Sequence, residues 1–379
     1  MPSEEFVKEI IRKDKKTFFK DYKDSQNTKY FYNEEFIDNQ DKCYLKPLIA
    51  DFTEYNPLHN GHYHCMKVAK EKVPDSIFVA IVPGLFERNG RGVPYILHRS
   101  SRAEIAINVG ADIVVEGPPM GIMGSGQYSL CLCKMFQALN TDFIPRGYKP
   151  FDGINDILNR ISLGHGIAPK PYKIIDMDTN EVIMRDKLKE DNYVIVSFSK
   201  SLKNIGFDFK NKFIFVKRIK GVSGTLIRES IENNNFDKVK NMMPKETISI
   251  LKRDIDLGYA PLNNIRDYET ILDNANNLSF EELISLNLFN DKLASKIIET
   301  RDKKPFETIN ELEDSLLYGF SSNYKQRVLS ILETKINKDI ISNYIEKYPY
   351  NIRILDYKNE DVLNQFKNKI TNRRIDLWQ

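Results

Sequence analysis

The chain has 379 residues, of which 41% are hydrophobic, 11% aromatic and 29% charged. This composition excludes disordered, collagen-like and fibrous proteins, and the length predicts two domains with room for a smaller third. The 56 Lys and Arg residues nearly balance the 53 Asp and Glu residues, which leaves a net charge of +3. Because the charge is so nearly balanced, a nucleic-acid or membrane surface would have to be local.

The four cysteines, Cys43, Cys65, Cys131 and Cys133, are too few and too scattered for a disulfide framework. We therefore expect buried thiols in a reducing compartment, and the cysteines do not have the spacing of a zinc site. The amino-terminal sequence lacks an apolar signal region, and no long apolar run follows it. The sequence predicts a cytoplasmic protein that does not bind a membrane.

Residues 1–45 mix acidic, basic and aromatic side chains and predict a helical arm that packs on a larger body. From residue 46, short apolar runs alternate with helical patterns. Strands are predicted at 47–52, 76–82, 111–115, 141–144 and 213–216, and helices at 61–72, 98–109, 126–139 and from about 225. This alternation predicts an α/β fold built on a Rossmann-like, doubly wound parallel sheet.

Two other parts of the chain are less regular. Residues 151–205 are partly helical, with a candidate strand at 193–196. From about residue 235 the pattern is mostly helical, so we predict one domain at 46–240 and a helical carboxy-terminal domain at 260–379.

The most informative segment is Glu54-Tyr-Asn-Pro-Leu-His59-Asn-Gly61-His62, which follows the first predicted strand and begins a helix. Open α/β sheets bind ligands at the carboxyl ends of their strands. A helix amino terminus presents free N–H groups to a phosphate, and Gly61 allows close approach of the backbone. We expect His59 and His62, as imidazolium or as neutral donors, to stabilise charge on a reacting phosphate. The alternative is an ordinary strand-to-helix loop with polar histidines.

A second motif, Gly221-Val-Ser223-Gly224-Thr225-Leu-Ile-Arg228, follows the strand at 213–216. Ser and Thr cap a helix and offer hydroxyl donors, and an arginine one turn later reaches a phosphate oxygen. The alternative for this motif is a capped helix with a solvated arginine.

Together, His-x-Gly-His and Ser-Gly-Thr-x-x-Arg resemble the nucleotidylyltransferase superfamily. With Val82-Pro-Gly84-Leu-Phe-Glu-Arg88 and Arg99-Ser-Ser-Arg102, the chain is similar to the tRNA(Met) cytidine acetate ligase family, as a divergent member. The resemblance implies a nucleotidylyltransferase domain at 46–240 that uses ATP and Mg²⁺. It implies that His59 and His62 are catalytic, and that Glu54, Asn56, Gly61, Gly84, Ser223, Gly224, Thr225 and Arg228 bind the nucleotide.

The implied reaction activates acetate or another carboxylate as an acyl-adenylate and transfers the acyl group to a tRNA cytidine. The chain departs from that family at Ile144-Pro-Arg-Gly, where a Phe-Gly-Ser-Glu type of segment is usual, and around 199–206. Two alternatives stay open. One is an adenylyl- or cytidylyltransferase that acts on a phosphorylated small molecule or cofactor precursor, and the other is an RNA-binding protein with a degenerate nucleotide pocket.

Several residues are candidates for contacts with a substrate or with RNA. The loop at 84–92 is predicted either to close over the triphosphate or an acidic substrate or to be a flexible surface loop. The loop at 117–126 is predicted either to contact the adenine or the acceptor or to be simply the entry to a helix. Residues 200–220 contain seven basic residues against one acidic residue, which predicts either an RNA-binding face or a solvated surface. The candidate side chains are Arg88, Arg99, Arg102, Lys210, Lys212 and Lys217.

Residues 277–332 resemble a tandem helix-hairpin-helix module, a type of module that binds nucleic-acid backbones through glycine-containing hairpins. The first hairpin, Leu288-Phe-Asn-Asp, lacks the glycine, and Gly319 lies near the second. Packing or protein contact is the alternative role for this segment.

Overall fold

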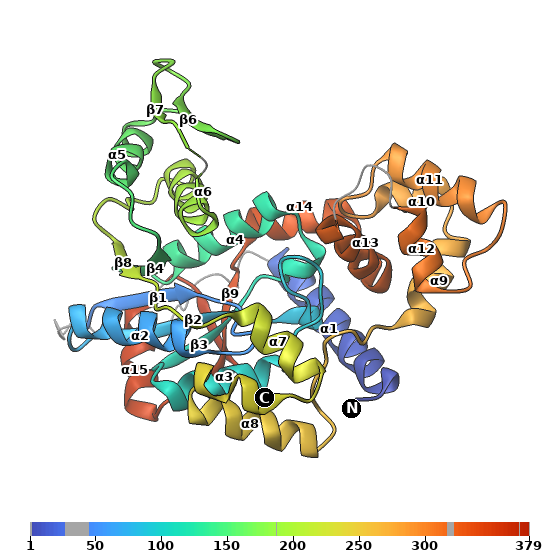
Figure 1. The fold of residues 1–379 in the computed structure, drawn as a ribbon, viewed down its shortest axis with the longest axis horizontal. Helices are drawn as coiled ribbons and strands as arrows, with labels where there is room; N and C mark the ends of the chain where they lie inside the picture. The colour runs from blue at the N-terminus through green and yellow to red at the C-terminus, as the bar shows by residue number, and fades with distance from the viewer. Residues whose placement is uncertain (1, 27–44, 187, 317–321, 371, 379) are drawn as a thin grey trace.

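The structure is a computed structural model that describes residues 2–26, 45–186, 188–316, 322–370 and 372–378 (Figure 1). Its core is a twisted sheet in which β1 (Leu48–Phe52), β2 (Ile77–Pro83) and β3 (Ile113–Gly117) are parallel neighbours. Strand β4 (Ile144–Tyr148) pairs in parallel with β8 (Phe213–Lys217), and a bridge between Ile49 and Phe143 brings β4 beside β1. The parallel order is therefore β3-β2-β1-β4-β8, which confirms the predicted doubly wound fold.

Alternate residues of each strand face opposite sides of the sheet, and each side has its own hydrophobic core. Ile49 and Ala80 belong to the cluster beneath α2 (Asn60–Lys72), α3 (Arg99–Val109), α7 (Gly224–Glu232) and α8 (Lys245–Asp256). Leu48 and Val79 belong to the cluster that α1 (Glu4–Ser25) and α4 (Ser125–Ala138) cover. Since both faces are covered, the strands read as continuous apolar runs, as buried parallel strands do.

The amino-terminal arm is a helix, as predicted. Helix α1 begins after Ser3, whose hydroxyl accepts a hydrogen bond from the Phe6 N–H, and it buries Val7, Ile11 and Phe18 against the body. The rest of the predicted arm, residues 27–44 with Cys43, lies outside the described residues.

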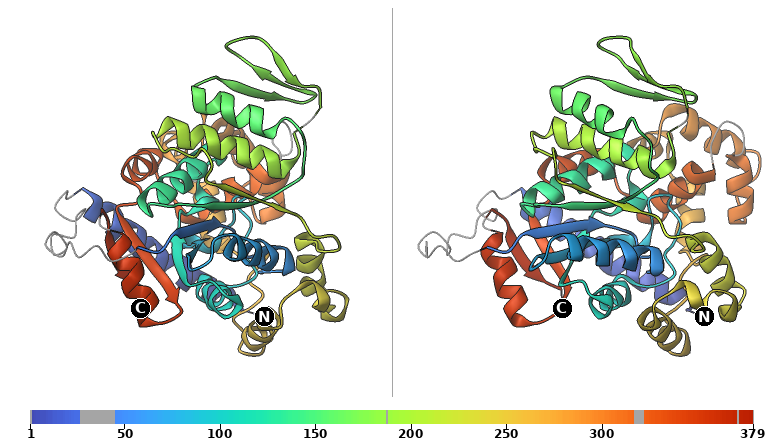
Figure 2. Two further views of the ribbon diagram at one scale, coloured as in Figure 1. Left: turned by 90° about the vertical axis from the view of Figure 1, so that its left-hand side faces the viewer. Right: turned by 60° about the vertical axis from the view of Figure 1, so that its left-hand side comes forward.

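Between β4 and β8 the chain forms what we call the insertion, made of α5 (Ile154–Leu163), β5 (Ile167–Lys170), β6 (Lys173–Asp176), β7 (Val182–Met184) and α6 (Glu190–Asn204). The candidate strand at 193–196 is wrong, because these residues lie within α6. Ile195, Phe198 and Leu202 are buried at helical spacing, and this pattern outweighs the local β-branched run. Figures 1 and 2 show the small antiparallel sheet of the insertion standing clear of the main sheet.

The carboxy-terminal part is mostly helical, as expected, but it also contributes to the sheet. Its helices run in the order α9 (Tyr268–Asn277), α10 (Phe280–Ser285), α11 (Asp291–Arg301), α12 (Ile309–Ser315), α13 (Ser322–Thr334) and α14 (Lys338–Lys347). They are followed by β9 (Asn351–Tyr357), α15 (Glu360–Lys369) and β10 (Arg374–Leu377). Strand β9 pairs antiparallel with β3 and parallel with β10, so two strands that the sequence did not indicate extend the sheet.

The first of the two predicted hairpins, between α10 and α11, packs against the body of the protein. Leu288 has a φ of 63°, the left-handed conformation that a glycine would adopt more easily. The neighbouring Asn287 side chain donates to the Ile122 carbonyl at 2.7 Å, and the Tyr324 hydroxyl donates to the Leu288 carbonyl at 2.5 Å. These contacts favour packing over nucleic-acid binding for this hairpin, while Gly319 lies outside the described residues.

Among the helices that the structure describes, none has an apolar stretch long enough to cross a bilayer. Cys131 and Cys133 are buried and Cys65 is half-buried, and all three are free thiols, in line with the expectation of structural cysteines.

Candidate functional site

The His-x-Gly-His segment forms the first turn of α2, directly beyond the carboxyl end of β1. His59 is the N-cap residue, and its Nδ1 accepts a hydrogen bond from the Gly61 N–H at 3.2 Å. The Nδ1 of His62 accepts in turn from the His59 N–H at 3.3 Å. The two imidazole rings stack with their centroids 3.7 Å apart and their planes within 10°. Backbone donors therefore occupy both Nδ1 atoms, and each ring keeps its Nε2 for other partners.

The surroundings of the two histidines decide their charge. Burial lowers the pKa of His59 to about 4, and the nearby Arg218 and Arg228 also disfavour its protonation. Burial lowers the pKa of His62 well below its usual value, and the charges of neighbouring groups act in the same direction. A neutral imidazole whose Nδ1 accepts a hydrogen bond carries its proton on Nε2. The sequence left open whether the histidines are imidazolium ions or neutral donors. The structure favours the neutral form, so both rings donate through Nε2–H at neutral pH.

The second motif is brought to the same place. Ser223 caps α7, with its hydroxyl accepting from the Leu226 N–H at 3.3 Å. The Arg228 guanidinium donates to Thr225 Oγ1 and to the Asn56 carbonyl, both at 3.2 Å. A methyl group built on Gly224 would lie 3.4 Å from His59 Nε2 and 3.3 Å from Arg228 Nη1.

The site thus combines the amino termini of two helices, a guanidinium group and two neutral N–H donors at one end of the sheet. Helix amino termini attract anions through unpaired N–H groups and the helix dipole. Arginine donates paired hydrogen bonds to phosphate oxygens. This arrangement has the chemistry needed to hold the phosphates of a nucleotide, and it lies where the strand order reverses between β1 and β4.

The other predicted nucleotide-binding residues form contacts that hold the loops next to the site in place. The Asn56 side chain is buried, and its Oδ1 accepts from the Ile96 N–H at 2.8 Å, which fixes the loop before α3. Glu54 Oε1 accepts from the Gly90 N–H at 3.1 Å. A methyl group on Gly84 would lie 2.1 Å from Glu116 Oε1, so this glycine is explained by close packing against Glu116.

Three arginines predicted to contact substrate or RNA are instead buried. Arg99 is 2% exposed, and it pairs with Asp14 of α1 at 2.5 Å and with Glu87 at 2.8 Å. Arg102 is fully buried, pairs with Glu87 at 2.9 Å and stacks on the Tyr95 ring at 3.8 Å.

Arg88 is equally enclosed, since its guanidinium forms two hydrogen bonds with Glu333 of α13, at 2.6 and 3.0 Å. All three side chains have their charges paired inside the protein. The prediction that Arg88, Arg99 and Arg102 bind substrate or RNA is therefore not supported, and the loop at 84–92 is a packed element in which residues 84–90 are buried.

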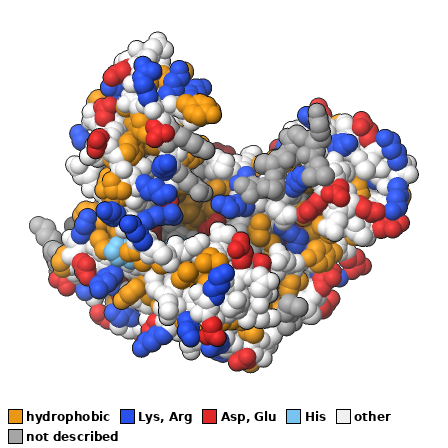
Figure 3. Space-filling model, viewed as in Figure 1, with side chains coloured by type: hydrophobic (Ala, Val, Ile, Leu, Met, Phe, Trp, Pro, Cys, Tyr) orange, Lys and Arg blue, Asp and Glu red, His pale blue; other side chains and the backbone are white. Residues whose placement is uncertain are grey.

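The three predicted surface lysines differ from one another. Lys210 and Lys217 are exposed. Lys212 donates to the Thr141 carbonyl at 2.8 Å and lies over the Phe207 ring, so it serves the packing of the insertion. Figure 3 shows this face of the molecule hollowed between the insertion and the helices α9–α13, with Lys and Arg side chains gathered on the insertion side.

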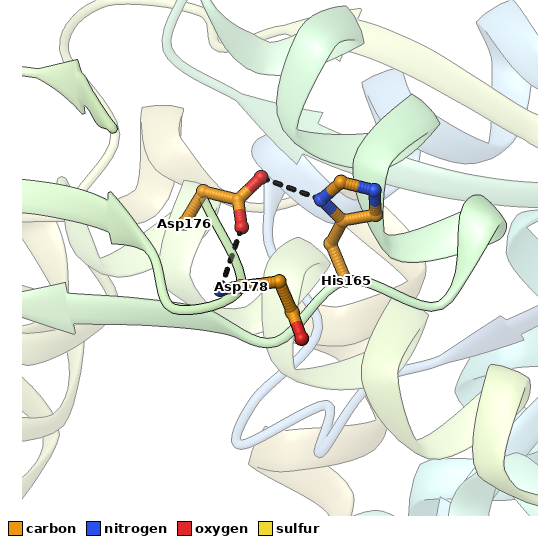
Figure 4. A group of neighbouring side chains, drawn as sticks. All are labelled: His165, Asp176 and Asp178. Carbon is orange, nitrogen blue, oxygen red and sulfur yellow. Dashed lines mark hydrogen bonds and ion pairs between the residues drawn. The ribbon is translucent and has the colours of Figure 1, made fainter. Parts of the chain in front are cut away.

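Among the described residues, one group has the side chains of a metal site, namely His165, Asp176 and Asp178 of the insertion (Figure 4). Asp176 Oδ2 accepts from His165 Nδ1 at 2.7 Å and from Arg160 Nη1 at 2.9 Å. Because the buried carboxylate of Asp176 is already paired with the Arg160 guanidinium, we interpret these three residues as a structural ion-pair cluster.

The structure adds one residue to the site that the sequence did not single out, Arg146 of β4. Its Nη1 donates to the carbonyl of Phe52, the last residue of β1, at 2.9 Å, and lies 3.6 Å from Asp51 Oδ1. The signal was available, since Arg146 follows a predicted strand in a segment where the chain departs from the resembled family. Its place beside β1 depends on the long-range neighbourhood of β4 and β1, which a local pattern does not encode.

The chain matches two family descriptions along its length. Residues 48–129 match the HIGH nucleotidyl transferase family, and residues 149–356 match the family described as the cytidyltransferase-related C-terminal region. The first of these matches contains the His-x-Gly-His turn, and the second contains the Ser-Gly-Thr-x-x-Arg turn.

Individual relatives extend over nearly the whole chain. Uncharacterized protein MJ0951 of Methanocaldococcus jannaschii is 45% identical over 94% of this chain and 95% of its own length. The tRNA(Met) cytidine acetate ligase of Thermotoga maritima is 24% identical over 83% of each chain. A crystal structure of Thermotoga maritima TmcAL bound with alpha-thio ATP aligns with a TM-score of 0.71 and 19% identity, over 88% of this chain and 85% of that one.

Proposed function

Because the chain belongs to the HIGH nucleotidyl transferase family and is a divergent relative of the tRNA(Met) cytidine acetate ligases, we propose that it binds ATP and activates a carboxylate. The product would be an acyl-adenylate, and acetate is the first candidate for the carboxylate. The observation that carries this proposal is the meeting of His59 Nε2, Gly224 and Arg228 Nη1, which joins both motifs into one anion site.

In the proposed reaction a carboxylate oxygen attacks the α-phosphorus of ATP, a new P–O bond forms, and pyrophosphate leaves with the electrons of the broken bond. The Nε2–H groups of His59 and His62 would donate to oxygens of the α-phosphate, where negative charge develops. Arg228 and the amino terminus of α7 would hold the β- and γ-phosphates and stabilise the departing pyrophosphate. Neither histidine needs to gain or lose a proton in this role.

We expect Mg²⁺ to assist as it does in the resembled family, by neutralising the phosphates of bound ATP. The charged groups that act on the two histidines are arginines, namely Arg146, Arg218 and Arg228. Mg²⁺ prefers oxygen ligands and commonly binds through one or two carboxylates together with phosphates. The donor set therefore fits a metal held mainly by the nucleotide, with Glu54 as the candidate protein carboxylate near the loop at 90.

We also propose a tRNA cytidine as the acyl acceptor. Its amino nitrogen would attack the carbonyl carbon of the acyl-adenylate, AMP would leave, and the nitrogen would lose a proton. Support comes from the tRNA(Met) cytidine acetate ligase of Thermotoga maritima, to which the chain is similar, and from the exposed side chains of Lys210 and Lys217.

The activation step is tested by exchange of labelled pyrophosphate into ATP, measured with Mg²⁺ and with acetate, propionate or succinate. Exchange that depends on a carboxylate is the expected result. Exchange that requires no carboxylate, or that appears only with a phosphorylated small molecule, would contradict the proposal and favour nucleotidyl transfer to another acceptor. Binding of ATP without any exchange would also contradict it.

The acceptor is tested by tRNA binding at several salt concentrations. Replacing Lys210 and Lys217 together by Gln should weaken binding and flatten its salt dependence, because fewer counterions are released. The matched control replaces Lys292 and Lys296 on the exposed side of α11, which should leave both quantities unchanged. Equal affinity and slope in both double variants would remove this face from the proposal.

A further inference from the structure

Arg146 reaches the site from the opposite side of the sheet to the histidines. Its neighbour Ile144 packs in the core cluster beneath α4, whereas Ile49 and Asp51 alternate onto the other face of the adjacent β1. The Arg146 side chain passes around the carboxyl end of β1, donating to the Phe52 carbonyl on the way. Its charge is close enough to lower the pKa of His62. Arg146 thus lies at the point where the strand order reverses.

Arg146 is half-buried, and its charge is less completely paired than those of Arg88, Arg99 and Arg353. Arg88 and Arg99 form hydrogen bonds to carboxylates, and Arg353 does so to Asp21 at 2.7 Å. Within the part of the chain that the structure describes, Arg146 forms a single hydrogen bond, which goes to a neutral carbonyl, and the carboxylate paired with it, that of Asp51, lies 3.6 Å away. Its Nε is buried and has no partner among the described residues. An arginine held in this way keeps donors for an added anion.

The weak pairing has a physical reason. Burial raises the pKa of Asp51 to about 7, so this carboxyl is only partly ionised at neutral pH and neutralises Arg146 incompletely. The Phe198 ring of α6 lies 5.4 Å from the guanidinium carbon and forms an apolar wall beside it. A guanidinium next to an aromatic ring offers a fork for a carboxylate and an apolar surface for the carbon attached to it.

We propose that Arg146 binds the carboxylate of the second substrate, and that Asp51 competes for the guanidinium until that substrate binds. This inference rests on the proposed activation of a carboxylate. In the proposed function the phosphates bind to Arg228, to the two histidines and to the amino termini of α2 and α7, all on the other face of the sheet from Arg146. A carboxylate bound at Arg146 would lie across the carboxyl end of β1 from Arg228, and an in-line attack requires the attacking oxygen to be opposite the departing pyrophosphate.

The test compares variants in the pyrophosphate exchange assay, using whichever of acetate, propionate and succinate supports exchange by the unaltered protein. Arg146→Gln should raise the KM for the carboxylate at least about tenfold, because a charged hydrogen-bond pair is lost. The Kd of a non-hydrolysable ATP analogue should stay within about twofold, since the phosphate site is untouched. Arg146→Lys keeps the charge without the fork and should give an intermediate KM. Arg253→Gln, an exposed ion-pair variant on α8, is the control.

Asp51→Asn separates ligand binding from a merely structural ion pair. If Arg146 binds the carboxylate, removing the competing charge of Asp51 leaves the KM unchanged or lowers it. If the two residues only stabilise each other, both substitutions raise the KM alike, and the proposal fails. A rise in the Kd of the ATP analogue with no change in the carboxylate KM would assign Arg146 to the phosphates and would also overturn it.

A second readout does not depend on turnover. With the ATP analogue bound, adding the carboxylate should shift the imidazole NMR signals of His62 in the unaltered protein but not in Arg146→Gln. Equal shifts in both would contradict the assignment. Failure of the proposed function is recognised separately, because it appears as an absence of carboxylate-dependent exchange in the unaltered protein.

Discussion

Replacing Glu333 by Gln tests whether Arg88 of the 84–92 loop is structural. The Glu333 carboxylate is fully buried and accepts four hydrogen bonds. Two come from the Arg88 guanidinium at 2.6 and 3.0 Å, one from Arg266 at 3.3 Å and one from the Asp267 N–H at 2.9 Å. Its pKa is held below the usual value by the two guanidinium groups, although burial acts in the opposite direction. Gln keeps the shape but leaves Arg88 and Arg266 as buried charges without a counter-charge.

Breaking a buried ion pair from one side costs about 3–5 kcal/mol, so we expect the free energy of unfolding to fall by about 4 kcal/mol. Urea denaturation followed by circular dichroism measures this loss. The matched control is Glu281→Gln on the exposed side of α10, for which a change within about 0.5 kcal/mol is expected. A loss below about 1 kcal/mol for Glu333→Gln would refute the reasoning. So would an Arg88→Met variant that keeps its stability but binds the ATP analogue tenfold more weakly.

Three further predictions concern the site itself. Gly224→Ala places a methyl group against Arg228 and His59, so the Kd of an ATP analogue measured by calorimetry should rise about tenfold at unchanged stability; an unchanged Kd would show that this turn does not face the nucleotide. Because the pKa of His59 is about 4, its imidazole NMR signals should not titrate between pH 5.5 and 8, and a midpoint near 6.5 would contradict the neutral assignment. Burial raises the pKa of Asp51 from 3.8 to about 7, so the folded state binds this proton more tightly and stability falls as pH rises towards 7. Asp51→Asn should therefore gain up to about 4 kcal/mol in unfolding free energy at pH 8.5 and far less at pH 4, whereas equal gains at both values would contradict the assignment.

The central sheet and the nucleotide motifs were predictable because their signals are local. Strands β1 to β4 are short apolar runs, and His59 and Ser223 are caps at the starts of helices. In the structure the caps at His59 and Ser223 lie close together. Sequence spacing alone does not show this, because it depends on the pairing of β8 with β4.

The buried charge network was not predictable from sequence pattern. Arg99 and Asp14 are 85 residues apart, and each lies in a helix whose charged residues suggest a solvated face. Strand β9 was missed for a related reason. Arg353 and Asp356 interrupt the apolar pattern of β9. The charge of Arg353 is compensated by hydrogen bonds to the carboxylates of Asp21 and Glu116, which lie far away in the sequence.

The place of β9 in the sheet has a consequence for how the chain is made. Glu116 at the end of β3 and its partner Arg353 in β9 are separated by 237 residues, all of which must be synthesised before the pair can form. Until then the outer edge of β3 has N–H and C=O groups without strand partners, and such edges pair readily with other extended chains. The amino-terminal half therefore emerges from the ribosome with an unpaired strand edge that can associate with other chains, and β9 pairs with this edge only after residue 357 has left the ribosome.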